Sequence, residues 1–286
     1  MNLHFRFSET LNFVYRINTH IGSLCPASNL KFMIGNPILE LQRVDSTNVY
    51  ANTLLETSEL AEGTVIWAHE QFAGRGQHEN HWESEAGKNL TFSIILKPDF
   101  LAPERQFLLT KVISLGIADF IQATLSGTPM GQQPLSSGIK WPNDIYINDR
   151  KIAGILIENK ILGNAIETSV AGVGVNINQT RYASEVPNPV SLVHLLHREM
   201  ELKASLQVIC KSIDHRYQML RNNNTEALDS AYHNKLIGFM KWRNFICEEM
   251  TLEGQIQGVD LLGRLMVKTT TGIIRVFSHK EIEYLF

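Results

Sequence analysis

The sequence contains few cysteines, and its three, Cys25, Cys210 and Cys247, are far apart. An odd and scattered set argues against a disulfide framework and a cysteine-based metal site, so we expect a reducing, cytoplasmic location. Long apolar runs are also absent. The longest, Phe92–Leu96 and Ile152–Ile157, have the length of strands and fall short of the roughly 18 residues that cross a bilayer. We therefore expect no membrane partner.

Runs of lysine and arginine are missing as well, and the net charge is −3. Binding of nucleic acid through a basic stripe needs such runs, so we expect no nucleic-acid partner and only local attraction of anions. The 286 residues are 44% apolar and 19% charged, which is ordinary for a globular protein. This length suits one large domain, or one domain with a small companion.

Residues 1–36 lack a regular pattern. The segment from Leu11 to Ile21 fits one helix, too little for a three-helix DNA-reading domain. Arg16, Asn18 and His20 interrupt the apolar core that a secretory signal needs. We expect residues 1–36 to be a poorly ordered extension.

Alternation of apolar residues and turn signals predicts the elements of the rest of the chain. Strands are predicted at 39–44, 64–70, 90–97, 145–147, 152–157 and 167–175, and helices after residue 48 to about 60, at 103–124, 191–199 and 203–222, and to about 233. From about residue 235 only short strands follow, at 244–248, 254–259, 264–269 and 273–278. Such closely spaced strands suggest a small barrel.

Two polar stretches follow the first two strands. Asp45 or Ser46 suits a helix N-cap, and capping alone explains it; alternatively, hydroxyls and free backbone N–H groups there hold a small polar ligand. In the loop after residue 70, paired glycines around Arg75 allow close approach to a phosphate, and Trp82 can stack on a flat ring. A plain surface loop is the alternative. The spacing matches neither a Walker A loop nor the dinucleotide fingerprint.

Two further polar stretches lie at 140–158 and 172–178. In the first, polar residues flank a hairpin with a turn at residues 148–149, and Gly154 interrupts its second strand, as where a ligand approaches; a solvated surface hairpin is the alternative. In the second, small residues alternate before Asn176 and Asn178. Buried asparagines need partners, which a ligand with amide or phosphate groups would supply, unless these side chains face water at a sheet edge.

In this order, the motifs Asp-Ser-Thr-Asn, Gly-Arg-Gly…Trp, Lys-Trp-Pro-Asn-Asp…Lys-x-Ala-Gly and Gly-x-Gly-x-Asn-x-Asn resemble those of the biotin protein ligases, over about residues 38–286. The resemblance implies an α+β fold. A mixed β-sheet with helices on one face, the class II synthetase-like biotin/lipoate ligase catalytic domain, is expected at residues 37–234, and a small SH3-like β-barrel at 235–286. It also implies a short form that lacks an N-terminal DNA-binding domain.

The resemblance implies a two-step reaction. Biotin and ATP form biotinyl-5′-AMP, and biotin then passes to a lysine ε-amine of a biotin carboxyl carrier protein, part of a biotin-dependent carboxylase. Mg²⁺ is expected to neutralise the triphosphate. Sheet-edge homodimers occur in such ligases, and the sequence leaves the oligomeric state open.

The resemblance also assigns residues by position. The residues expected to bind biotin are Ser46, Thr47, Asn48, Gln71, Arg75, Gly76, Gln77, Lys151 and Gly154. Those expected at the nucleotide are Arg75, Trp82, Lys140, Asn143 and Asn176. Lys151, Arg75 and Asp144 are expected to be catalytic, with Lys151 bridging the carboxylate and the α-phosphate and Asp144 accepting a hydrogen bond from the incoming amine. No metal ligands are assigned.

The loop departs from the pattern that this family commonly shows, Gly-Arg-Gly-Arg-x-Gly-Arg-x-Trp. Gln77 and Asn80 replace two arginines, and Glu79 replaces a glycine. Less positive charge should weaken the hold on the adenylate, so we expect it to escape faster than from an arginine-rich loop.

Three alternatives stay open at this point. A lipoate or octanoate ligase of the same superfamily shares the fold and the overall logic, but would leave Ser46, Thr47 and Gln71 without a ureido ring to bind. A biotin-responsive repressor needs a DNA-binding domain, for which residues 1–36 are too short. A non-catalytic biotin-binding protein would be expected to lack Lys151, which is present.

Overall fold

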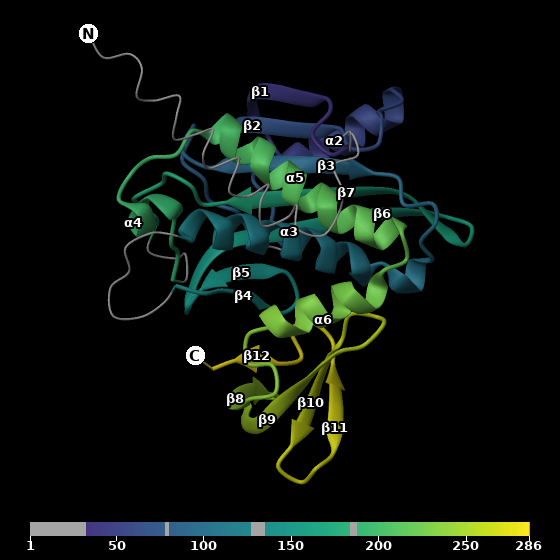
Figure 1. The fold of residues 1–286 in the computed structure, drawn as a ribbon, viewed down its shortest axis with the longest axis vertical. Helices are drawn as coiled ribbons and strands as arrows, with labels where there is room; N and C mark the ends of the chain where they lie inside the picture. Colours follow the sequence, from purple (N-terminus) through teal and green to yellow (C-terminus); the bar gives the residue numbers. More distant parts are fainter. Residues whose placement is uncertain (1–32, 78–79, 127–134, 184–187, 286) are drawn as a thin grey trace.

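The computed structural model describes residues 33–77, 80–126, 135–183 and 188–285. Almost all of the segment expected to be a poorly ordered extension, residues 1–32 of 1–36, lies outside the described residues. The described part contains one large sheet, one small sheet and the helices that cover them (Figure 1).

The large sheet has seven strands in the order β1-β2-β3-β7-β6-β5-β4. Its strands are β1 (Ile38–Val44), β2 (Val65–Gln71), β3 (Leu90–Leu96), β4 (Ser137–Lys140), β5 (Asp144–Ile147), β6 (Arg150–Leu162) and β7 (Ala165–Val175). The pair β1–β2 is parallel and the other pairs are antiparallel, which confirms the prediction of a mixed sheet. The tight turn at residues 148–149 is confirmed, and Asn148 adopts the positive φ of 56° that such a turn favours.

Most helices cover one face of this sheet. The 3₁₀ turn Pro103–Arg105 leads into α3 (Phe107–Leu125), and α5 (Leu202–Arg221) lies beside α3 across the sheet (Figure 1). The short helix α4 (Leu192–Leu196) precedes α5, and α6 (Thr225–Lys235) follows it. The segment Pro103–Leu125 is long and apolar enough to cross a membrane, but it is mostly buried as the central core helix.

The helix α2 (Thr47–Thr57) covers the opposite face, so the expectation of helices on one face is wrong for this helix. Its Ala51 packs with Ile66, Ile95 and Val170, which form a second core cluster. The physical reason lies in the strands: β2 and β3 are apolar on both faces, and both faces therefore need cover.

The small sheet confirms the prediction of a β-rich C-terminal unit. Its five antiparallel strands are β8 (Trp242–Cys247), β9 (Met250–Val259), β10 (Leu265–Thr269), β11 (Ile274–Phe277) and β12 (Glu283–Tyr284), in the order β11-β10-β9-β8-β12. It lies beyond α6, near β4 and β5 (Figure 1). The boundary predicted between residues 234 and 235 stays a prediction.

The C-terminal unit touches the turn between β4 and β5. The indole Nε1 of Trp141 donates to the carbonyl oxygen of Gly263 at 2.8 Å, and the ring of His279 lies edge-on to Trp141 at 6.1 Å. From α6, the hydroxyl of Tyr232 donates to the carbonyl oxygen of Pro142 at 3.1 Å. This turn is therefore held from outside the large sheet.

Candidate active site

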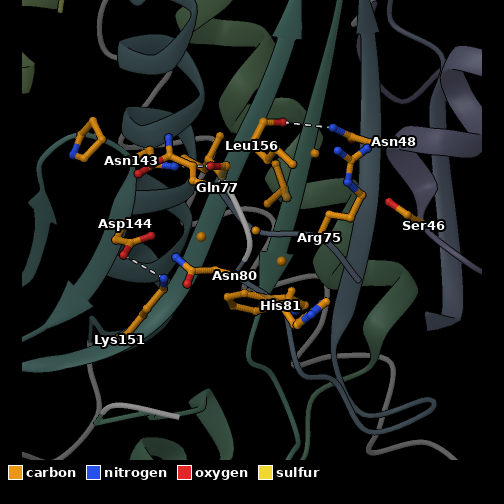
Figure 2. A pocket seen from close by; sticks show the side chains of 18 of the residues that line it. Ser46, Asn48, Arg75, Gln77, Asn80, His81, Asn143, Asp144, Lys151 and Leu156 are labelled. Atoms are coloured by element: carbon orange, nitrogen blue, oxygen red, sulfur yellow. Dashed lines mark hydrogen bonds and ion pairs between the residues drawn. The ribbon is translucent and has the colours of Figure 1, made fainter. Parts of the chain in front are cut away.

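A pocket opens on the face of the sheet that α2 covers. It lies between the start of α2, the loop after β2, the β4–β5 turn and strands β6 and β7, and has about 900 Å³ of empty space, which includes some open solvent. Figure 2 shows Asp144 and Lys151 facing Ser46, Asn48 and Arg75 across it. The lining residues are Ser46, Thr47, Asn48, Gln71, Arg75, Gly76, Gln77, Asn80, His81, Trp82, Lys140, Trp141, Pro142, Asn143, Asp144, Lys151, Gly154, Ile155, Leu156, Gly172, Val173, Gly174 and His279.

Strand alternation makes the hollow. On β6 and β7, the side chains of Ile155, Val173 and the other alternate residues belong to the main core. The side chains of the residues between them therefore face the pocket. Two of these are Gly172 and Gly174, where a Cβ atom would stand 2.3 Å from Asn48 Oδ1 and 2.2 Å from Trp82 Cε2, respectively. Glycine is required at both positions because the side chains of the pocket lie directly on the sheet.

The floor of the pocket is a hydrogen-bonded row of four side chains. The backbone N–H of Thr47 donates to Gln71 Oε1 at 2.7 Å, and Thr47 Oγ1 lies 3.0 Å from the same oxygen. Ser93 Oγ lies 2.7 Å from both Thr47 Oγ1 and Asn48 Oδ1. The N-cap prediction is confirmed at Ser46, whose side chain makes no capping hydrogen bond. The row fixes the residues that follow β1.

This row is one proton short. Gln71 must present its oxygen, because it accepts the N–H of Thr47. Asn48 must present Oδ1 to Ser93, because its Nδ2 donates to the carbonyl oxygen of Leu156 at 3.3 Å. Two hydroxyl protons therefore serve three oxygen–oxygen contacts. A ligand that brings an N–H donor would complete the network.

The loop after β2 folds back on itself. The N–H of Gly76 donates to the carbonyl oxygen of Asn80 at 2.7 Å, and the N–H of Trp82 donates to that of Gly74 at 3.0 Å. A Cβ atom at Gly74 would stand 2.6 Å from the carbonyl oxygen of Trp82. Gly74 is therefore needed for this close approach, whatever the loop binds.

Trp82 and Lys151 meet above the sheet. Lys151 Nζ lies 5.9 Å from the centre of a Trp82 ring and 2.7 Å from Asp144 Oδ2. The indole Nε1 of Trp82 is buried and has no hydrogen-bond partner among the described residues. The pocket thus presents a flat ring, a cation and an unused donor side by side.

Lys140 lies on the other side of Asp144. Its Nζ is 5.5 Å from the ring centre of Tyr146 and 5.7 Å from that of Tyr284, which belongs to the C-terminal unit. Burial lowers the pKa of Lys140, an effect that Asp144 opposes and Lys151 reinforces. Burial, with Asp144 nearby, raises the pKa of Tyr146 to about 12.

The structure brings all the predicted site residues to this pocket except one. Asn176 does not line it; its Nδ2 donates to the carbonyl oxygen of Val190 at 3.1 Å, and its buried Oδ1 has no partner among the described residues. Asn178 is bound through both ends of its amide to the backbone of Met200, at 2.8 and 2.9 Å. Asn143 lines the pocket, but its Nδ2 donates to the carbonyl oxygen of Ile155. The assigned roles stay predictions.

Sequence reasoning missed several lining residues. Trp141 and Pro142 stood inside a quoted motif without an assigned role, while His279 comes from the distant C-terminal unit and carried no local signal. Ser93 holds two lining residues from behind and is fully buried on β3. An apolar strand gives no hint that one of its hydroxyls supports a site.

A protein-built metal cage is absent from the described part of the chain, where no three His, Cys, Asp or Glu side chains converge. Asp144 is the one carboxylate among the described lining residues, and it already pairs with Lys151.

Comparison with known proteins gives concordant results. Residues 40–176 match the Biotin/lipoate A/B protein ligase family. The chain is 26% identical over 274 residues to the bifunctional ligase/repressor BirA of Bacillus spizizenii, covering 92% of this chain and 80% of that protein. It is 34% identical over 142 residues to the biotin--[acetyl-CoA-carboxylase] ligase of Paracoccus denitrificans, covering 48% of this chain and 53% of that protein.

The fold agrees with a solved structure. The biotin protein ligase of Aquifex aeolicus, solved in complex with biotin and ATP, superposes with a TM-score of 0.69 at 22% identity. The match covers 86% of this chain and 97% of the Aquifex chain. At this identity the likeness concerns the fold alone.

Proposed function

We propose that the chain is an ATP-dependent biotin–protein ligase, because its residues 40–176 match the Biotin/lipoate A/B protein ligase family and it is similar to the biotin--[acetyl-CoA-carboxylase] ligase of Paracoccus denitrificans. It activates biotin as biotinyl-5′-AMP and passes biotin to a lysine of a biotin carboxyl carrier protein. One observation carries the proposal. A floor that needs an N–H donor and a cation held by a carboxylate lie in a single pocket, at Thr47–Gln71 and at Lys151–Asp144.

The floor suits the cyclic urea of biotin. The urea brings two N–H donors, and the row around Ser93 needs one. The urea also brings a carbonyl oxygen, to which the hydroxyl of Ser46 can donate. The chain of the ligand then runs past the side chains of Asn48 and Trp82, which lie over Gly172 and Gly174. This orientation directs its carboxylate toward Lys151.

The first step joins two anions. A carboxylate oxygen of biotin attacks the α-phosphorus of ATP, the bond to the β-phosphate oxygen breaks, and pyrophosphate leaves. Arg75, Lys140 and Lys151 line the pocket and supply the positive charge that this approach requires. Lys151 bridges the carboxylate and the α-phosphate, and Trp82 stacks on the adenine. We propose that the triphosphate is bound with Mg²⁺, which would neutralise part of its charge.

The second step consumes the adenylate. The lysine nitrogen attacks the acyl carbon, the bond to the phosphate oxygen breaks, and AMP leaves. Asp144 accepts a hydrogen bond from the amine as it attacks. We also propose a cytoplasmic protein with no membrane or nucleic-acid partner. A homodimer through the open edge at β1 is testable by analytical ultracentrifugation.

A lipoate ligase is the second candidate, since the family name includes both substrates. A dithiolane ring has no N–H group, and it would leave the row around Ser93 short of its proton. Calorimetric titration separates the candidates: we expect biotin to bind and lipoic acid to give no heat of binding. If lipoic acid binds tightly and biotin does not bind, the protein is a lipoate ligase.

Transfer is tested with a purified carrier protein. Incubation with biotin and ATP should add one biotin to a single lysine, detected by mass spectrometry. The Bacillus relative is also named a repressor. We propose the ligase activity alone, since the pocket accounts for it; a tight gel shift on the upstream region of biotin genes would add the second activity.

A further inference from the structure

Glu158 lies next to the pocket without lining it. It follows Gly154 and Leu156 on the pocket-facing side of β6. Its side chain is 31% exposed, and it touches residues of both α2 and the loop after β2. A carboxylate beside a site for two anionic substrates calls for an explanation, because it opposes their binding.

One oxygen of Glu158 holds α2. Oε2 accepts from Asn48 Nδ2 at 3.0 Å and from Asn52 Nδ2 at 3.1 Å. The contact keeps the nitrogen of Asn48 toward β6, and thereby keeps Oδ1 toward Ser93. Glu158 thus fixes which end of the Asn48 amide faces the floor of the pocket.

The other oxygen faces the loop. Oε1 lies 3.5 Å from Arg75 Nη1, and the Arg75 side chain is 51% exposed. Any anion in the pocket must share this guanidinium with Glu158 or displace it. At such separation and exposure an ion pair changes an equilibrium by only about twofold to fivefold. The pair is therefore weak enough to exchange partners.

We propose that Glu158 is a positioning residue with two separable effects on the proposed ligase, on which this inference rests. Its negative charge competes with the anionic intermediate for Arg75 and so limits how long the pocket retains biotinyl-5′-AMP. Its role as a hydrogen-bond acceptor holds Asn48 in the orientation that receives the head group. The first effect needs the charge, and the second needs only the oxygen.

Two substitutions separate these effects. Glu158→Gln keeps an oxygen for Asn48 and removes the charge, whereas Glu158→Ala removes both. Glu167→Gln is the matched control, because Glu167 on β7 pairs with Lys160 at 2.7 Å and does not line the pocket. Release of biotinyl-5′-AMP is measured by stopped-flow tryptophan fluorescence with excess biotin as the chase, and biotin affinity by calorimetry.

We expect Glu158→Gln to slow release of the adenylate about twofold to fivefold without weakening the binding of biotin. Added salt should reduce this difference, because it screens the charges. Glu158→Ala should weaken biotin binding, and the control should change neither quantity. Unchanged or faster release in Glu158→Gln overturns the proposal, even if Glu158→Ala fails to fold. If the wild type binds no biotin, it is the proposed function that fails.

Discussion

Lys151 Nζ and Asp144 Oδ2 lie 2.7 Å apart, on the paired strands β6 and β5, respectively. The pair is about one quarter exposed on both sides, so water reaches it and ligands can replace either partner. In the proposed mechanism, Lys151 is the cation of the first step and Asp144 is the acceptor of the second, so the two groups are held in contact before either step begins.

Asp144→Asn should separate the two steps. The substitution keeps the shape and removes the charge that would receive the incoming amine. We expect transfer to the carrier protein to fall by at least about tenfold, since an acid–base group typically contributes a hundredfold or more. Formation of the adenylate should change little. Single-turnover transfer from preformed adenylate measures the effect, and equal losses in both steps would contradict it.

Gln77→Arg should restore a cation to the loop after β2. Gln77 lines the pocket, and hydrogen bonds to charged groups contribute about 1.5–3 kcal/mol, so we expect biotinyl-5′-AMP to leave about tenfold more slowly. The control is Gln255→Arg, on β9 of the small sheet. An unchanged rate of release in Gln77→Arg would refute the expectation that loop charge governs retention.

Gly174→Ala should impair binding of ATP more than binding of biotin. The new Cβ would stand 2.2 Å from Trp82 Cε2, so the indole must leave its place on the sheet. We expect the KM for ATP to rise about tenfold, in line with the 1–3 kcal/mol that stacking of a base on an aromatic ring contributes. Adding Trp82→Phe to Gly174→Ala should lower the KM for ATP again in part. An unchanged KM in the double variant would show that the clash with Trp82 does not cause the rise.

Ser93→Ala should cost both stability and affinity. The change leaves the buried Oδ1 of Asn48 without its partner, which costs about 1–3 kcal/mol in the free energy of unfolding. Thr91→Val is the control on the same strand, because its hydroxyl donates to the carbonyl oxygen of Ala68 at 2.9 Å and supports no lining residue. Urea denaturation should register both changes, whereas calorimetry should show weaker biotin binding only for Ser93→Ala.

The sequence was sufficient for most of the large sheet, since alternation in β1 and β6 and the turn at Asn148 are local signals. It was insufficient for α2, whose position on the far face depends on Ile66 and Ile95 pointing away from the main core. Asn176 shows the same limit. Its spacing suits a ligand, but the carbonyl oxygen of Val190, from a segment that follows later in the chain, takes its amide.

The site depended on contacts between distant segments. Residues 46–48, 71–82 and 140–154 could be predicted because each carries a polar motif at the end of a strand. His279 could not be predicted, because it lies in the C-terminal unit, far along the chain from the β4–β5 turn that it contacts. Residues that hold the predicted ones in place, such as Ser93 and Glu158, can be identified only from interatomic distances in the structure.

The most direct measurement is ATP–pyrophosphate exchange, because it reports formation of the adenylate without a carrier protein. We expect exchange that depends on biotin and not on lipoic acid, and a loss of about a hundredfold or more in Lys151→Ala, as for removal of one donor from a charge-stabilising site. The fold of the variant is checked by its urea transition. Exchange that is absent with biotin, or undiminished in a folded Lys151→Ala protein, would contradict the account.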